Sequence, residues 1–159
     1  MRKLTLLVIG LVAGLTLSST AQTVTTHLFE SELQEKLNYD GNSFTSSGEY
    51  YRGAIKVEVS PHNLSLKRGQ EVVFSETLIP ADTEDLGKWT IYGFYGANKR
   101  GLIVTVLINK PETVRENGDY GMIWLTERNG SDSSGVSLLL TKSLGSVTRN
   151  VAMSLGLEE

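Results

Sequence analysis

The alternation of apolar and polar residues from about residue 50 onward predicts that most of the chain folds as β-strands. The segment from Tyr50 to Ser60 places Ile55, Val57 and Val59 on one face and polar side chains on the other, as in a half-buried strand. Similar runs follow, and the strands predicted in this way are residues 50–60, 63–67, 70–79, 89–95, 102–108, 120–127 and 136–141. Because most connections are too short for crossover helices, we expect an all-β fold, an antiparallel meander packed as a sandwich or small barrel.

Prolines and glycines set the expected ends of these strands. Pro61 and Pro80 have no backbone N–H for the ladder, so we expect them to end the strands that precede them. The acidic residues 81–87 are then expected to form a loop. Residues 96–101 have a glycine at each end and are expected to connect the two strands of a hairpin.

The two ends of the chain follow a different pattern. Phe29, Leu33 and Leu37 recur every four residues with charged residues between them, which predicts a short amphipathic N-terminal helix over residues 28–37. Residues 147–155 fit both the four-residue spacing of a helix and the alternation of a strand. We therefore leave two interpretations open for that segment, and a C-terminal helix there would make the fold α+β.

Several of the predicted strands are apolar on both faces. The segment from Leu102 to Ile108 has only one polar side chain, Thr105. A sheet that exposes one face to solvent alternates more cleanly, so something is expected to cover the second face. The candidates are the predicted helix over 28–37, a second copy of the chain, a bound apolar ligand and a bilayer.

The N-terminal residues have the features of a secretory signal peptide. Arg2 and Lys3 precede an apolar run from Leu4 to Leu17, and small residues follow up to Ala21. We expect residues 1–21 to be removed and residues 22–159 to form a single β-rich domain. The protein is then exported to the periplasm or the extracellular space, and the processed chain is not a transmembrane protein.

Charge and composition narrow the classes of partner. Without the first 21 residues the chain has 13 basic and 18 acidic residues, a net charge of −5, which argues against a nucleic-acid partner. The chain has no cysteine, which excludes disulfides, thiol catalysis and thiolate metal sites.

Motifs for catalysis or metal binding are missing from the sequence. It has two histidines, His27 and His62, and no nucleophile elbow, histidine pair with metal-ligand spacing or nucleotide-binding glycine motif. Residues 38–49 space oxygen ligands as an EF-hand does, but Ser43 stands where the sharp turn requires glycine. We therefore predict no catalytic residue, no metal and no cofactor. The alternative is a secreted hydrolase that uses loop carboxylates, and its candidate residues are Asp82, Glu84, Asp85, Glu112 and Asp119.

An aromatic segment is the best candidate for a binding surface. Four of the 12 aromatic residues lie within residues 89–95, and a basic hairpin tip follows. Tyrosine and tryptophan combine a large apolar ring with a hydrogen-bonding group, which suits ligand and partner binding. The residues predicted to bind a ligand or partner are Trp89, Tyr92, Tyr95 and Arg100.

A short part of this segment resembles a known family. Gly87-Lys88-Trp89 followed by Tyr92-Gly93 is similar to the Gly-x-Trp strand of lipocalins. In lipocalins this strand comes first and seven more follow, whereas here it lies in mid-chain. The resemblance implies a small apolar ligand.

We expect this protein to be a non-enzymatic binding or interaction module whose partner is a protein or a small apolar ligand. The hydrolase described above is one alternative. A self-assembling structural subunit is another, because strands that are apolar on both faces favour a homo-oligomer.

Overall fold

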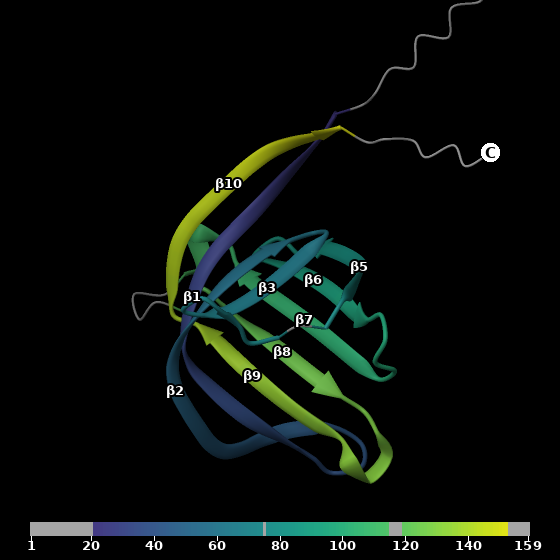
Figure 1. Cartoon of the computed structure of the whole chain (residues 1–159). Coiled ribbons are helices and arrows are strands. Elements are labelled where there is room, and N and C mark those ends of the chain that lie inside the picture. The colour runs from purple at the N-terminus through teal and green to yellow at the C-terminus, as the bar shows by residue number, and fades with distance from the viewer. Residues whose placement is uncertain (1–20, 75, 115–118, 153–159) are drawn as a thin grey trace, which may run out of the picture.

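The structure is a computed structural model that describes residues 21–74, 76–114 and 119–152 (Figure 1). Within these ranges the chain is nearly all β, as the alternating pattern predicted, and the helical segments are two short 3-10 turns, η1 (Pro111–Thr113) and η2 (Gly130–Asp132). None of the described helices is long and apolar enough to cross a membrane. Of the predicted signal peptide, residues 1–20 lie outside the described residues and Ala21 is the first residue of a strand.

The strands form one antiparallel sheet in the order β4-β3-β2-β1-β9-β8-β7-β6-β5, with β10 also paired to β1. Their bounds are β1 (Ala21–Tyr39), β2 (Phe44–Ser60), β3 (Asn63–Arg68), β4 (Glu71–Val72), β5 (Leu78–Asp85), β6 (Trp89–Gly96), β7 (Leu102–Asn109), β8 (Gly121–Glu127), β9 (Ser134–Leu140) and β10 (Lys142–Ala152). The sheet is not closed, because β4 and β5 are its two ends. The predicted antiparallel arrangement is therefore confirmed, whereas a sandwich or barrel is not.

Strand β1 joins the two parts of the sheet. It pairs with β2 along one edge, and with β10 and then β9 along the other. We call β2–β4 the N-terminal wing and β5–β9 the C-terminal wing. Within each wing, strands that follow one another in sequence are hydrogen-bonded neighbours, because short turns connect them.

The core lies between the two wings. Inward side chains of β2 and β3 pack with those of β6–β9 in a single cluster, so the sheet must curl until its two wings face each other. Burial of each such aliphatic side chain contributes about 1.5–3 kcal/mol, which makes this cluster the main source of stability. The buried members include Ile55, Val57, Val59, Leu64, Leu66, Phe94, Val104, Val106, Ile123 and Leu138.

The predicted helix over residues 28–37 is wrong, because these residues belong to β1. The register with β2 shifts between Ser31 and Leu33. Phe29 before this irregularity is buried in the core, whereas Leu33 after it pairs with Leu139 on the opposite, outer face. The four-residue spacing thus arises from a strand whose alternation is interrupted.

The C-terminal segment is also a strand. Residues 147–152 belong to β10, so a helix over them is wrong, and residues 153–155 lie outside the described ranges. Strand β10 pairs with the first ten residues of β1. Together they form a two-stranded arm that extends from the body of the molecule (Figure 1).

The prediction for residues 70–87 is wrong in its details. The single strand expected over 70–79 is replaced by β4 and the start of β5, and most of the expected acidic loop belongs to β5. Pro80 lies inside β5 rather than ending a strand. An edge strand tolerates proline because its free side has no ladder to complete, and the register of β5 with β6 shifts just after this residue.

Candidate functional site

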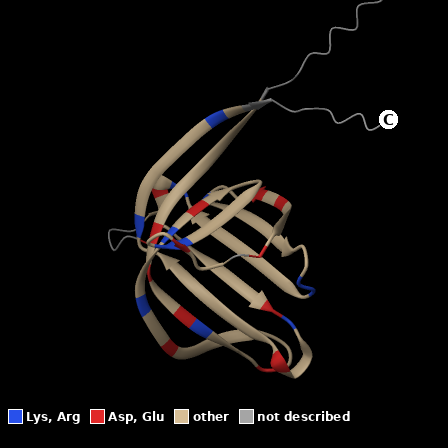
Figure 2. Ribbon diagram, in the orientation of Figure 1, with Lys and Arg blue, Asp and Glu red and all other residues tan. Residues whose placement is uncertain are grey.

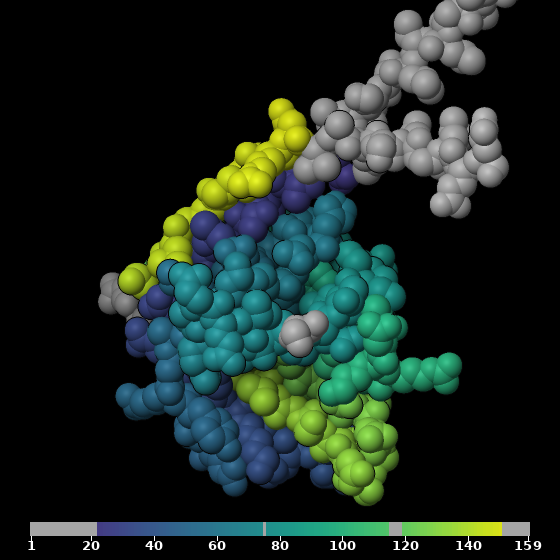
Figure 3. All heavy atoms as spheres, viewed as in Figure 1, coloured from purple at the N-terminus to yellow at the C-terminus, as the bar shows by residue number. Residues whose placement is uncertain are grey.

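A cavity of about 590 Å³ lies between the two wings. Its floor is the hydrophobic core itself, formed by the buried Ile55 and Leu66 from one wing and Leu102 and Leu138 from the other. Phe74 and Leu125, which are partly buried, extend the apolar lining. In the space-filling view the teal residues of the N-terminal wing lie across the yellow-green β9 (Figure 3).

Beyond the long β2, the strands of the N-terminal wing are shorter than the central strands of the C-terminal wing. Strand β3 has six residues and β4 only two, whereas β7–β9 have seven or eight. Val136 of β9 pairs with Leu125, whose side chain lines the cavity, yet Val136 is 38% exposed. The N-terminal wing therefore leaves the inner face of β8 and β9 open at this end.

Three basic side chains and one acidic side chain line the same cavity. They are Lys36 from β1, Arg68 from β3, Lys99 from the β6–β7 turn and Glu127 from β8. Lys99 Nζ lies 2.6 Å from Glu127 Oε2, and Lys36 Nζ lies 3.3 Å from Oε2 of Glu49, outside the lining. The cavity thus combines an apolar floor with a positively charged rim.

Gln34 stabilises the wall where β1 meets β2. Its side chain is 5% exposed, and its Nε2 donates a hydrogen bond of 2.8 Å to the carbonyl oxygen of Gly53. Throughout the described part of the chain, no buried side-chain nitrogen or oxygen lacks a partner. The buried polar groups of the wall therefore already have hydrogen-bond partners. What the cavity offers a ligand is its apolar surface and the charges of its rim.

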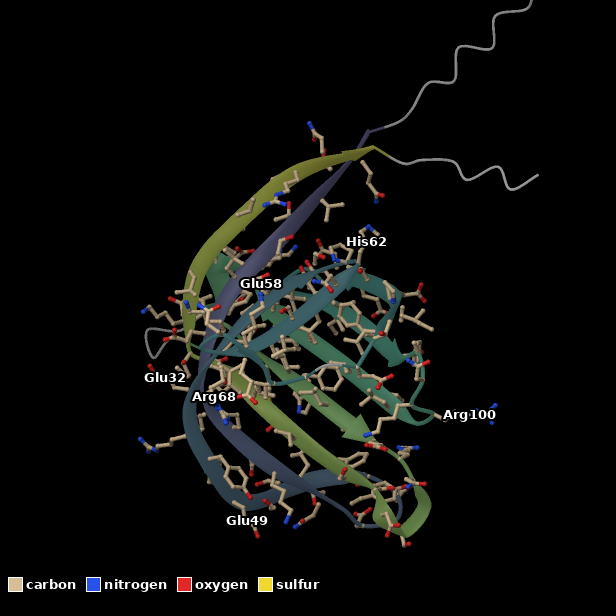
Figure 4. The ribbon with its side chains drawn as sticks, in the orientation of Figure 1. Glu32, Glu49, Glu58, His62, Arg68 and Arg100 are labelled. Carbon is tan, nitrogen blue, oxygen red and sulfur yellow. The ribbon has the colours of Figure 1, made fainter. Side chains whose placement is uncertain are left out.

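The four residues predicted to bind are not brought together. Tyr92 is 5% exposed and belongs to the core, and its burial, with a smaller contribution from Asp85, raises the pKa of its hydroxyl. Trp89 and Tyr95 are exposed, at 42% and 53%. Arg100 extends from the tip of the β6–β7 hairpin (Figure 4). None of the four lines the cavity between the wings.

The outer face of the C-terminal wing carries an apolar row. Register places Ile91, Leu107, Met122, Leu139 and Leu33 side by side across β6, β7, β8, β9 and β1. We call these five residues the outer row. The central strands of this wing are almost free of charged residues (Figure 2). The helix expected to cover this face is β1 itself, and all five residues of the row are partly exposed.

The carboxylates proposed for a hydrolase lie in different surroundings. Asp82 and Glu84 are exposed on β5, while both oxygens of Asp85 accept hydrogen bonds from Lys110 Nζ at 2.7 and 3.0 Å. The Lys110 hydrogen bond is the main cause that lowers the pKa of Asp85, the direction opposite to that needed in a general acid.

Glu112 and Asp119 line a second cavity, of about 490 Å³, beside Trp89. Asn109 Nδ2 donates to the backbone oxygen of Asp119 at 2.8 Å, which holds this residue just before β8. Across the described ranges no group of three or more histidine or carboxylate side chains could hold a metal ion.

The EF-hand-like segment forms the turn between β1 and β2. Asp40 Oδ1 accepts hydrogen bonds from the backbone amides of Asn42 and Ser43, at 2.9 and 2.8 Å. These bonds lower the pKa of Asp40. Its carboxylate therefore has a structural role in the hairpin turn.

Sequence reasoning missed Lys36 and Arg68 as site residues. Lys36 is one of the charged residues within the helix predicted over 28–37, and Arg68 falls between the strands predicted over 63–67 and 70–79. Each is brought to the cavity by the curl of the sheet, which places residues of β1 and β3 opposite β8 and β9. No local pattern at Lys36 or Arg68 indicates that β8 and β9 lie opposite. The sequence therefore carries no signal that either residue lines a cavity.

No protein family model, curated protein or solved structure matches this chain.

Proposed function

We propose that this protein is a non-enzymatic binding module that holds a small apolar ligand in the cavity between its wings. The observation that carries the proposal is a cavity of about 590 Å³ whose floor is the hydrophobic core. Binding sites for small molecules are typically concave, mainly apolar and supplied with a few polar groups. Each methylene group buried on that floor favours binding by about 0.8 kcal/mol.

Blocking the cavity tests this proposal. We expect 1-dodecanol, a neutral apolar probe, to bind the purified chain in isothermal titration calorimetry. Val136→Trp places a large ring in the cavity wall and should weaken dodecanol binding at least about tenfold. Val147→Trp is the matched control, because Val147 is a strand residue of similar exposure on the arm, 42% against 38%.

Undiminished binding to the Val136→Trp variant, or no binding to the wild-type chain, would contradict the cavity as the binding site. Far-ultraviolet circular dichroism and the melting temperature establish that each variant is folded.

We also propose export, on the evidence of residues 1–21. The expected result is that protein recovered from the periplasm or medium of its source cell has the mass of a chain that begins at Gln22. Recovery of the uncleaved chain in the cytosol would contradict export.

A second candidate function is self-assembly through the outer row. An apolar row without charges is complementary to itself, so the occupant we propose is the same face of a second copy. Ile103, which pairs with Tyr95 and Thr126 on the same outer face, is 39% exposed, and Tyr95 is 53% exposed. Both would be buried in such an interface.

Native mass spectrometry of residues 22–159 tests self-assembly. An integer multiple of the chain mass is expected, and Ile103→Lys should return it to a single chain mass. Val72→Lys on β4, where Val72 is 50% exposed, is the control and should leave the assembly intact. A wild-type monomer at micromolar concentration would exclude this second function.

A further inference from the structure

The charges of the cavity between the wings indicate what kind of ligand it accepts. Its lining contains Lys36, Arg68 and Lys99 but a single acidic residue, Glu127. This excess of positive charge stands in contrast to the net charge of −5 of residues 22–159. A local concentration of cations in an acidic protein favours an anionic group at that place.

The three cations differ in how they are already paired. Lys99 is held by Glu127 at 2.6 Å, and Lys36 lies 3.3 Å from Glu49. Arg68 forms no ion pair and no side-chain hydrogen bond with any described residue, and Figure 4 shows it well apart from Glu49. An incoming anion can therefore bind Arg68 without breaking an existing ion pair.

The position of Arg68 within the cavity also matters. Leu66, two residues earlier on the same face of β3, is 2% exposed and belongs to the floor, whereas Arg68 itself is exposed. Two successive side chains on one face of β3 thus lie at the apolar floor and at the charged rim. A ligand that matches this gradient has an apolar chain and an anionic head.

We propose that the cavity binds a single-chain amphipathic carboxylate, with its hydrocarbon chain on the floor and its carboxylate against the guanidinium of Arg68. This inference rests on the proposed binding function and specifies its ligand class. The planar guanidinium presents two parallel N–H donors that match a carboxylate, and such charge-assisted bonds are stronger than neutral ones. Lys36 adds positive charge at the same rim, because its own ion pair with Glu49 is solvent-exposed and weak.

The test compares three probes that share one hydrocarbon chain: dodecanoate, 1-dodecanol and dodecylammonium. We expect dodecanoate to bind about tenfold more tightly than dodecanol, and dodecylammonium to bind less tightly than dodecanol. Arg68→Gln should reduce dodecanoate affinity about tenfold and dodecanol affinity much less, because the alcohol forms no ion pair with the guanidinium. Arg149→Gln removes the same charge from an exposed position on the arm and should change neither.

The possible results separate the two proposals. If dodecanol does not bind, or binds outside the cavity as judged with Val136→Trp, the binding function itself fails. If dodecanol binds as expected but dodecanoate gains no advantage, only the ligand class is overturned. An equal loss of dodecanoate affinity in Arg68→Gln and Arg149→Gln would also overturn it, because the effect would then come from total charge rather than from this guanidinium.

Discussion

Neighbouring residues of β6 have opposite environments, because successive side chains of a strand point to opposite faces. Tyr92 and Phe94 are buried in the core, whereas Tyr95 is 53% exposed. The aromatic segment is therefore divided between the packing of the core and the outer surface of the C-terminal wing.

We expect Tyr92→Ala to lower the free energy of unfolding by about 3–5 kcal/mol, as deletion of a buried aromatic ring does. Tyr95→Ala should change it by less than about 0.5 kcal/mol, since it is a surface substitution. Urea denaturation measures both values. Similar losses in the two variants would show that Tyr95 is packed against something in solution, such as a second copy.

His27 makes stability depend on pH. Its ring lies 6.3 Å from those of Phe29 and Tyr92, and burial lowers its pKa below the ordinary value of 6.5. The unfolded chain thus binds a proton at a higher pH than the folded chain. Stability from this group is intact above about pH 6.5 and is lost as the pH falls from there through the lower pKa of the folded state.

We expect the melting temperature of the wild-type chain to fall between about pH 7.5 and pH 5.5, a range chosen to lie around the histidine pKa and above those of most carboxylates. The melting temperature of His27→Gln should fall less over the same range. That of His62→Gln, a substitution at an exposed turn position, should fall as much as that of the wild type. An equal fall in all three proteins would assign the pH dependence to other groups.

At the scale of single elements, the arm formed by β1 and β10 differs from the other paired strands. Its side-chain hydrogen bonds, Thr23 to Asn150 and Thr25 to Thr148, are both exposed and 3.2 Å long. Residues 21–26 of β1 pair with β10 and with no other described strand. An isolated two-stranded ribbon has little intrinsic stability.

Hydrogen exchange should therefore be fast for the amides of residues 23–26 and 146–150 and slow for Val104 and Val106 in β7, which are fully buried. Mass spectrometry after proteolysis measures both. Slow exchange in the arm would indicate that another chain or a ligand covers its free edges.

The start of β8 depends on a glycine. Gly121 has a φ of +144°, and a Cβ added there would collide with the carbonyl oxygen of Leu107 on the paired strand. We expect Gly121→Ala to cost about 2 kcal/mol or more. Gly130 also has a positive φ, +56°, but a Cβ added there meets open space. We therefore expect Gly130→Ala to cost only about 1 kcal/mol of stability. Chemical denaturation of the two variants compares them, and equal costs would contradict a backbone collision.

For the whole molecule, the shared core makes the two wings one folding unit. Val57 from β2 and Val106 from β7 belong to the same cluster, so neither wing can bury its inner face alone. We therefore expect the single curled sheet to unfold in one transition.

We expect Val57→Ala to shift the denaturation midpoint of tryptophan fluorescence as much as that of circular dichroism. Val57 lies in the N-terminal wing, whereas Trp89 and Trp124 report on the other wing. The lost methyl groups should cost about 1–3 kcal/mol. A fluorescence midpoint that stays at the wild-type value would show that the wings unfold independently.

Much of the fold could be predicted from local patterns. Ile55, Val57 and Val59 alternate with polar residues, and all three are buried as expected. Pro61 follows the end of β2, and the glycines at 96 and 101 flank the β6–β7 turn. The prediction failed for β1 because the interruption near Ser31 gave a strand the spacing of a helix. It failed at Pro80 because the pattern does not show that β5 is an edge strand.

The candidate site was beyond prediction for a different reason. Local patterns predict β2, β3 and β6–β9, their antiparallel pairing and their inward faces, because these depend on residues close together in the chain. Long-range packing is what brings Lys36, Arg68 and Lys99 around one apolar cavity and makes Tyr92 part of the core. These outcomes depend on how far the sheet curls around β1, and that curl is set by packing between residues far apart in the chain.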